Sequence, residues 1–299
     1  MQFPKPEFMP REIPRDFRFE KLFAHFADYD YFQQGTFFPF QTHDLHLNNV
    51  WWLAEFSLLI YAEADVIDHW LQSLAIKEVI RREVAGLRVL VLVFSTHVVV
   101  VFRGTHVDCK ENILTDLKCL PISYGRHGYV HQGFLQGLHS LWKSLYQSLW
   151  PFLDGRPVWF TGHSLGGALA TLAFERLQQN AFMVNFGAPR VGNKTFCERM
   201  TRPAYRVVNN NDIVPHLPPG GFYQHHGELI YLDCHGQMLR QPDLWRQVKS
   251  AMAGHQQHLV QWWQAQFQGH SLQIPWDALV DHSPFHYCIH LWNDMVRRV

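Results

Sequence analysis

The chain has 299 residues, of which 47% are hydrophobic and 17% charged, a balance that excludes an intrinsically disordered protein. Lys and Arg together number 26, as do Asp and Glu, so the formal net charge is zero, which argues against a generic basic nucleic-acid binder. Aromatic residues reach 15% of the chain, a load that suits an apolar core and a surface that meets lipid or another apolar substrate.

The N-terminal residues 1–48 are rich in Pro and Phe and show little periodicity, so we expect an arm packed on a single domain spanning 49–299. The first twenty residues carry prolines and charges where a signal peptide needs an apolar segment. The most apolar stretch, 87–102, is interrupted by Arg88 and falls short of a membrane span. We therefore expect no transmembrane segment and a cytoplasmic location, with non-classical export as the alternative.

The elements expected along the domain follow from hydrophobic spacing. Helical spacing predicts helices over 49–73 and 135–149, and β-branched runs predict adjacent buried strands at 87–94 and 98–102. The pattern then predicts a strand at 158–161, a helix at 167–178, and strands at 182–186 and 204–208. This order is typical of an α/β protein with a mostly parallel sheet and helices on both faces. A helical insertion is expected near 241–270.

Cysteine and histidine patterns do not indicate a metal or redox site. Five cysteines occur without a CxxC pair, and 20 histidines without an HExxH motif. We expect free thiols, with a Cys109–Cys119 disulfide as the alternative.

The most specific motif is a glycine-rich turn around Ser164. Gly162-His163-Ser164-Leu165-Gly166-Gly167 stands between a predicted strand and a predicted helix, as a nucleophile elbow requires. The turn is so tight that the residues two positions on either side of the serine must be small, which explains Gly162 and Gly166. The serine then projects its hydroxyl at the start of a helix, where N–H groups favour developing negative charge.

A serine nucleophile needs a base that is oriented by a carboxylate, in the chain order Ser, acid, His. Asp212 follows the predicted strand at 204–208 and is the candidate acid, with Asp233 and Asp243 as alternatives. His282 is the candidate base, with His286 and His270 as alternatives.

The oxyanion hole needs two donors. The backbone N–H of Leu165 is one candidate, and Thr105, in the loop after the strand at 98–102, is the other. Arg103 is expected to anchor that loop by a salt bridge.

Four segments, in order, resemble the class 3 lipases, the fungal-type triacylglycerol lipases. They are Val101–Thr105, Val130–Phe134, Gly162–Ala170 and Asn185–Asn193, the last of which contains the diagnostic phrase FGxPRVGN. Asp212 and the Asp281-His282 pair fall where this family places its acid and base. The resemblance covers the chain from about Trp51 to the C-terminus.

The resemblance implies an α/β-hydrolase fold with a short helical lid over the active site. The lid would span His106 to about Lys118, with Ile113, Leu114 and Leu117 on its apolar side. A plain connection between two elements is the alternative.

The function expected is a serine hydrolase that cleaves carboxylic esters of lipids, an acylglycerol lipase, with no cofactor and no metal. Expected partners are a lipid or other ester substrate and, transiently, a lipid interface, but no nucleic acid. The alternatives are a phospholipase A-type enzyme, a feruloyl-like polar esterase, an acyltransferase and, less favoured, a silent lipase-like binding protein.

Overall fold

The computed structural model describes residues 8–13, 29–32, 35–104, 120–267 and 280–299, with 256–267 described by backbone alone. In this part of the chain, eight strands form one sheet in the order β1-β2-β3-β6-β7-β9-β11-β12. Their bounds are β1 Ile76–Val84, β2 Leu87–Phe94, β3 Val98–Phe102, β6 Val158–His163, β7 Ala181–Phe186, β9 Ala204–Asn209, β11 Glu228–Leu232 and β12 Met238–Arg240.

The five strands from β3 to β11 pair in parallel, whereas β1, β2 and β12 pair antiparallel at the two ends of the sheet. Every residue of β3, VVVVF, is buried. A continuous apolar run of this kind is what a strand covered on both faces requires.

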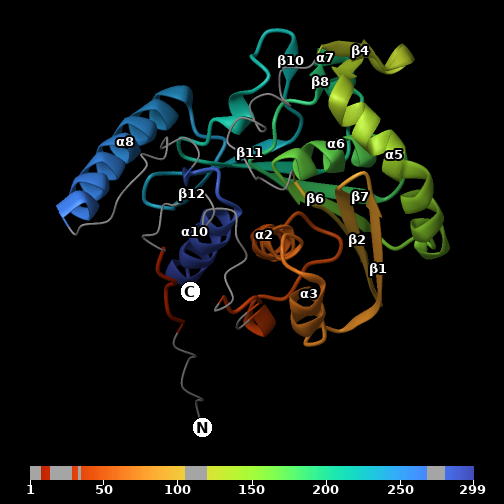
Figure 1. The fold of residues 1–299 in the computed structure, drawn as a ribbon, viewed down its shortest axis with the longest axis horizontal. Helices are drawn as coiled ribbons and strands as arrows, with labels where there is room; N and C mark the ends of the chain where they lie inside the picture. The colour runs from red at the N-terminus through yellow and green to blue at the C-terminus, as the bar shows by residue number, and fades with distance from the viewer. Residues whose placement is uncertain (1–7, 14–28, 33–34, 105–119, 268–279) are drawn as a thin grey trace.

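Helices cover both faces of this sheet (Figure 1). Val99 and Val101 of β3 point to the core under α2 and α10, while Val98, Val100 and Phe102 point to the core under α5 and α6. This alternation follows from the two-residue repeat of a strand. The four helices are α2 Leu47–Leu59, α5 Gln132–Leu149, α6 Leu165–Leu177 and α10 Pro284–Arg297. The α/β fold with a mostly parallel sheet between helices is therefore confirmed.

The smaller elements complete the fold. The strands β10, β8, β5 and β4 form a second sheet in that order. Their bounds are β4 Pro121–Ser123, β5 Tyr129–His131, β8 Gly192–Asn193 and β10 Tyr223–Gln224. The remaining helices are α3 Ala64–Leu71, α7 Lys194–Glu198 and α8 Leu244–Phe267, and the 3₁₀ turns are Gly35–Phe37, Gly125–His127, Trp150–Phe152 and Val214–His216. No helix in the described ranges has the length and apolarity that crossing a bilayer demands.

The continuous helix predicted over 49–73 is wrong, because the structure has two helices, α2 and α3, separated by a turn at 60–63. In this turn the carbonyl of Ala62 accepts a hydrogen bond from Arg88 Nη1 at 3.1 Å. The turn also lets the Tyr61 hydroxyl reach the ring of His163. The tertiary contacts of the residues in this turn thus determine where α2 ends.

The described parts of residues 1–48 lie against α2 and α10. The ring of Phe8 contacts that of Trp292, with 6.4 Å between centroids, and the Arg11 N–H donates to Asn293 Oδ1 at 2.7 Å. The division into an arm at 1–48 and a domain at 49–299 stays a prediction. The backbone of α8 is helical inside the stretch where the insertion near 241–270 is expected.

Candidate active site

Ser164 lies at the junction of β6 and α6. Its backbone has φ 58° and ψ −128°, a conformation that residues other than glycine rarely adopt. Such strain persists only where the surroundings impose it. The glycines on either side allow the turn. A Cβ on Gly162 would lie 2.5 Å from the carbonyl carbon of Gly166, and one on Gly166 would lie 2.2 Å from the carbonyl oxygen of Phe102. The sequence therefore folds here as an elbow because only glycine fits at both positions.

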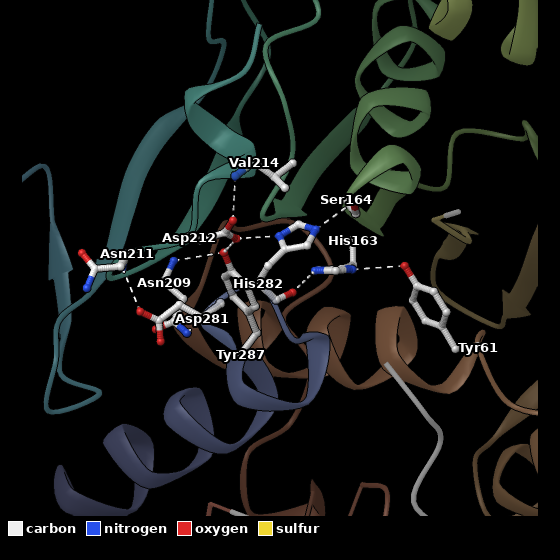
Figure 2. Close-up of polar contacts among 10 residues, drawn as sticks. All are labelled: Tyr61, His163, Ser164, Asn209, Asn211, Asp212, Val214, Asp281, His282 and Tyr287. Atoms are coloured by element: carbon white, nitrogen blue, oxygen red, sulfur yellow. Dashed lines mark hydrogen bonds and ion pairs between the residues drawn. The ribbon is translucent and has the colours of Figure 1, made fainter. Parts of the chain in front are cut away.

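Three residues far apart in the chain meet at this elbow (Figure 2). His282 Nε2 lies 2.9 Å from Ser164 Oγ, and His282 Nδ1 lies 2.8 Å from Asp212 Oδ2. The side chains of His282 and Asp212 are fully buried. An ionised carboxylate can only accept, so Nδ1 carries the proton and Nε2 is the acceptor for the serine hydroxyl. The structure thus brings the candidate nucleophile, base and acid into one hydrogen-bonded line.

The carboxylate of Asp212 accepts two further hydrogen bonds that fix its orientation. The Val214 N–H donates to Oδ1 at 2.9 Å, and the Tyr287 hydroxyl donates to Oδ2 at 2.6 Å. Burial, with the nearby Asp212 carboxylate, raises the pKa of Tyr287 well above its usual value, so this phenol stays a donor. The Asn209 N–H in turn donates to the Tyr287 oxygen at 3.0 Å.

Asp281 holds the loop of His282 against the loop of Asp212. Its Oδ2 accepts from the Asn211 N–H at 3.0 Å and from Asn210 Nδ2 at 3.2 Å, and its backbone carbonyl accepts from Asn209 Nδ2 at 2.9 Å. This carboxylate therefore joins the two loops that carry the candidate base and acid.

His163, beside the nucleophile, is a supporting residue that the sequence did not reveal. Its Nε2 lies 2.7 Å from the carbonyl oxygen of His282, and its Nδ1 lies 3.1 Å from the Tyr61 hydroxyl. Burial, and then the nearby His282, lowers the pKa of His163 well below its usual value, so the ring is neutral. A carbonyl accepts only, so Nε2–H donates to it and Nδ1 accepts from Tyr61, whose pKa is raised by burial. His163 thereby fixes the backbone of His282.

Gly187 lies over the contact between the candidate acid and base. Its φ is +55°, and a Cβ there would lie 2.7 Å from Asp212 Oδ2 and 3.0 Å from His282 Nδ1. The Gly187 N–H donates to the Val207 carbonyl at 3.0 Å, which fixes the approach of this backbone. A side chain is thus excluded on two grounds, conformation and space.

Of the two candidate oxyanion donors, one lies among the described residues. Leu165 is the first residue of α6, so its N–H has no partner inside the helix and is available to a ligand near Ser164. Thr105 and the lid segment, with Ile113, Leu114 and Leu117, lie outside the described residues. Among the described residues, the Arg103 guanidinium Nη2 donates to the Gly86 carbonyl at 2.7 Å, while the expected salt bridge of Arg103 stays a prediction. The sharp turn between β1 and β2 presents that carbonyl.

The alternative acids have local structural roles. Asp233 Oδ1 accepts from the N–H groups of His235 and Gln237, and Asp243 Oδ1 accepts from the Arg246 N–H. Of the alternative bases, His286 is buried on α10, and His270 lies outside the described residues. Ser164 and Asp212 both bond to His282, so the geometry favours His282.

Other histidines and the cysteines of the described residues lie outside this hydrogen-bonded line. His225 Nε2 donates to the Pro215 carbonyl at 2.7 Å. Cys197, Cys234 and Cys288 are free thiols, while Cys109 and Cys119 lie outside the described residues. Within the described ranges, no group of three or more His, Cys, Asp or Glu side chains is placed to hold a metal ion.

Comparisons with known proteins point to one family. A family model described as Lipase (class 3) matches residues 99–222, a range that includes Ser164 and Asp212 but ends before His282. A lipase of Rhizomucor miehei is 36% identical over 150 residues, covering 44% of this chain and 41% of that lipase. The secreted mono- and diacylglycerol lipase 1 of Fusarium solani is 36% identical over 114 residues, covering 35% of this chain and 34% of that protein.

A solved structure shares the fold as well. The triacylglyceride lipase of Rhizomucor miehei superposes with a TM-score of 0.56 at 27% identity, over 62% of this chain and 80% of that one. The chain spans less than half the length of each of these two curated relatives.

Proposed function

We propose that this chain, which belongs to the class 3 lipase family through residues 99–222, is a serine hydrolase that cleaves carboxylic esters of lipids, with acylglycerols as its substrates. The observation that carries the proposal is the hydrogen-bonded line from Ser164 through His282 to Asp212 on a strained strand-to-helix turn. The likeness to lipases of this family supports lipid esters as the substrate class.

In the first half of the reaction, Ser164 Oγ attacks the ester carbonyl carbon while His282 Nε2 takes the hydroxyl proton. The imidazolium that forms is stabilised by Asp212, which also keeps the ring in the required tautomer. The negative oxygen of the tetrahedral intermediate accepts from the Leu165 N–H and, we propose, from Thr105. The intermediate then expels the alcohol, which takes its proton from His282, and leaves an acyl-serine.

In the second half, His282 takes a proton from water as the water oxygen attacks the acyl carbon. Collapse of this second intermediate returns the proton to Ser164 Oγ and releases the fatty acid. His163 and Tyr287 do not touch the reacting atoms; they position the His282 backbone and the Asp212 carboxylate. These residues account for the whole reaction without a cofactor.

Labelling with a fluorophosphonate tests the nucleophile. We expect one label per chain on the native protein, and no label on Ser164→Ala, with kcat for a short-chain nitrophenyl ester reduced about 10⁴-fold or more. Ser140→Ala is the matched control, because Ser140 is an exposed serine on α5 whose hydroxyl bonds only within its helix. Labelling that persists in Ser164→Ala would overturn the assignment. Turnover of any ester rejects a silent binding protein.

A substrate panel tests the substrate class. Initial rates on triolein, monoolein, phosphatidylcholine and methyl ferulate are compared at equal enzyme concentration. We expect the acylglycerols to be hydrolysed fastest. Faster hydrolysis of phosphatidylcholine or methyl ferulate would replace the acylglycerol lipase by a phospholipase or a polar esterase, with the same serine chemistry.

A further inference from the structure

A cavity of about 490 Å³ lies at the end of the sheet that α6 does not cover. Its floor is formed by β9 and β11, and the first turns of α8 form one wall. Figure 1 shows α8 at the opposite side of the molecule from α5, beside β11 and β12. Asn211 and Ile213, on either side of Asp212, also line the cavity, whereas Ser164 and His282 do not. It is therefore a space separate from the candidate active site, behind the loop of the candidate acid.

β9, one of the two strands of the floor, carries Arg206 at a position where the alternation of its side chains predicts an apolar residue. Ala204, Arg206 and Val208 alternate along β9 and share one face, and Ala204 packs in the core under α6. Further along the same face of β9, Arg206 and Val208 line the cavity. An arginine on the interior face of a sheet is costly unless an anion compensates its charge.

Among the described residues that line the cavity, no carboxylate compensates the charge of Arg206. None of the described residues that line it is Asp or Glu, and a second arginine, Arg190, is among them. Burial, and then the like charge of Arg190, lowers the pKa of Arg206 to about 10, so the guanidinium stays charged at neutral pH. Arg190 Nη1 donates to the carbonyls of His216 and Pro218, which satisfies that donor but brings no negative charge. The cavity therefore holds two positive charges without a counter-ion among the described side chains that line it.

The rest of the lining is largely apolar. Leu229 and Tyr231 of β11 continue the floor, and Leu244 and Val248 of α8 line the cavity from above. Leu244 is 75% exposed and Val248 41%, so this part of the cavity opens to the surface along an apolar strip of the helix. Exposed apolar side chains beside a cavity mark a place where an apolar ligand loses contact with water.

We propose that this cavity binds an amphiphile with an anionic head group, a carboxylate or a phosphate, and an alkyl chain. The head group accepts hydrogen bonds from Arg206 and Arg190, and the chain lies along the apolar strip of α8. The site is independent of the ester hydrolysis proposed above, because neither Ser164 nor His282 contributes to it.

Calorimetric titration of the full chain tests this site with ligands that are not esters. The probes are dodecanoate and dodecyl phosphate below their micelle concentrations, 1-dodecanol as the uncharged chain, and acetate and inorganic phosphate as the bare head groups. We expect one or both anionic amphiphiles to bind at one site that depends on Arg206, and their relative affinities identify the head group. Dodecanol and the bare head groups should bind at least about 10-fold more weakly.

Arg206→Gln should weaken binding of the amphiphile by about 10- to 100-fold, as expected for lost hydrogen bonds to a charged group. The matched control is Arg246→Gln, an exposed arginine of α8 outside the cavity, which should leave the affinity unchanged within twofold. The unliganded Arg206→Gln protein should melt no lower than the wild type, because it loses a partly buried charge that no described lining residue compensates. If Arg206 served only to stabilise the fold, Arg206→Gln would melt at a lower temperature than the wild type.

Val248→Glu is a second variant that leaves both arginines in place and adds a carboxylate at the partly exposed rim of the cavity. It should also weaken binding about 10-fold by competing for the guanidinium groups. The proposal is overturned if the wild type binds neither amphiphile, if dodecanol or a bare head group binds as tightly, or if neither variant weakens binding.

Discussion

Gly187 shows how one residue without a side chain keeps two others in contact. Its left-handed backbone and the 2.7 Å that would separate a Cβ from Asp212 Oδ2 both exclude a larger residue. In Gly187→Ala the methyl group would have to displace the carboxylate or the ring of His282. We expect kcat/KM for a short-chain ester to fall about 100-fold or more, because a shift of about 1 Å in such a contact has that effect.

The control for Gly187→Ala is Gly86→Ala. Gly86 also has a positive φ, +78°, but nothing lies within 4 Å of a Cβ built there. Both variants should lose about 1–2 kcal/mol of stability through backbone strain, as measured by urea unfolding. Only Gly187→Ala should lose activity at a temperature where both are folded. Equal activity in the two variants would mean that a methyl group at position 187, close to Asp212 and His282, has no effect on catalysis.

At the same scale, the sequence indicated the residues whose chemistry leaves a local signature. Ser164 stands in a glycine pattern that a tight turn requires, and Asp212 follows a predicted strand. The structure places both within hydrogen-bonding distance of His282, while their catalytic roles stay proposals. His163 and Tyr61 were not found, because their contact depends on a break in a helix that the apolar pattern concealed. The position of His163 directly before the nucleophile was the only signal in the sequence.

At the scale of elements, buried strands were easier to predict than the sheet edges. β2 and β3 are runs of apolar residues, and the structure has them at 87–94 and 98–102, as predicted. β1, with the sequence IKEVIRREV, was missed because it is an edge strand whose charged residues face solvent and hide the alternation. The boundary between α2 and α3 was missed because side-chain contacts, not helix propensity, set it.

α2 carries a buried carboxylate that joins it to the N-terminal residues. Glu55 has no exposed side-chain surface and accepts hydrogen bonds from Arg11 Nη1 at 3.0 Å, the Tyr29 hydroxyl at 2.5 Å and Trp51 Nε1 at 3.1 Å on one oxygen. The other oxygen accepts from the Phe32 N–H at 3.0 Å. These contacts hold two separate parts of the chain before residue 33 against one helix.

Removing this carboxylate should destabilise the fold. In Glu55→Ala the buried donors lose their acceptor, and Arg11 is left as a partly buried charge without its partner. We expect a loss of about 3–5 kcal/mol in the free energy of unfolding, measured by urea denaturation. Glu78→Ala, at an exposed position of β1, should change it by no more than about 0.5 kcal/mol. A small effect of Glu55→Ala would show that the N-terminal contacts contribute little to the fold.

At the scale of the whole molecule, the candidate site depends on the integrity of the complete sheet. His282 is 118 positions from Ser164 and 70 from Asp212, and its loop precedes α10, which packs on α2. The described N-terminal residues close against that same helix through Trp292 and Asn293 (Figure 1). Conditions that unfold the molecule therefore also separate the candidate triad.

Acid should be such a condition, because several histidines are buried or half-buried in neutral form. Burial lowers the pKa of His97 to about 4, of His225 to about 3 and of His226 to about 4, and it lowers that of His163 well below its usual value. In the unfolded chain these rings titrate near pH 6.5, so below that pH the unfolded state binds more protons than the folded state. Stability is therefore fully present above about pH 6.5 and falls as the pH drops towards 4, by up to about 1.4 kcal/mol per pH unit for each ring.

His97→Phe tests this account, because His97 lies between the parallel rings of Phe40 and Phe94, at centroid distances of 4.6 and 4.4 Å, and a phenyl ring keeps this stacking. Between pH 5 and 6, the slope of unfolding free energy against pH, from urea titrations, should decrease by about 1 kcal/mol per pH unit. His235→Gln, at an exposed position, is the matched control and should leave the slope unchanged. An unchanged slope in His97→Phe would show that His97 is not among the groups that take up protons when the molecule unfolds in acid.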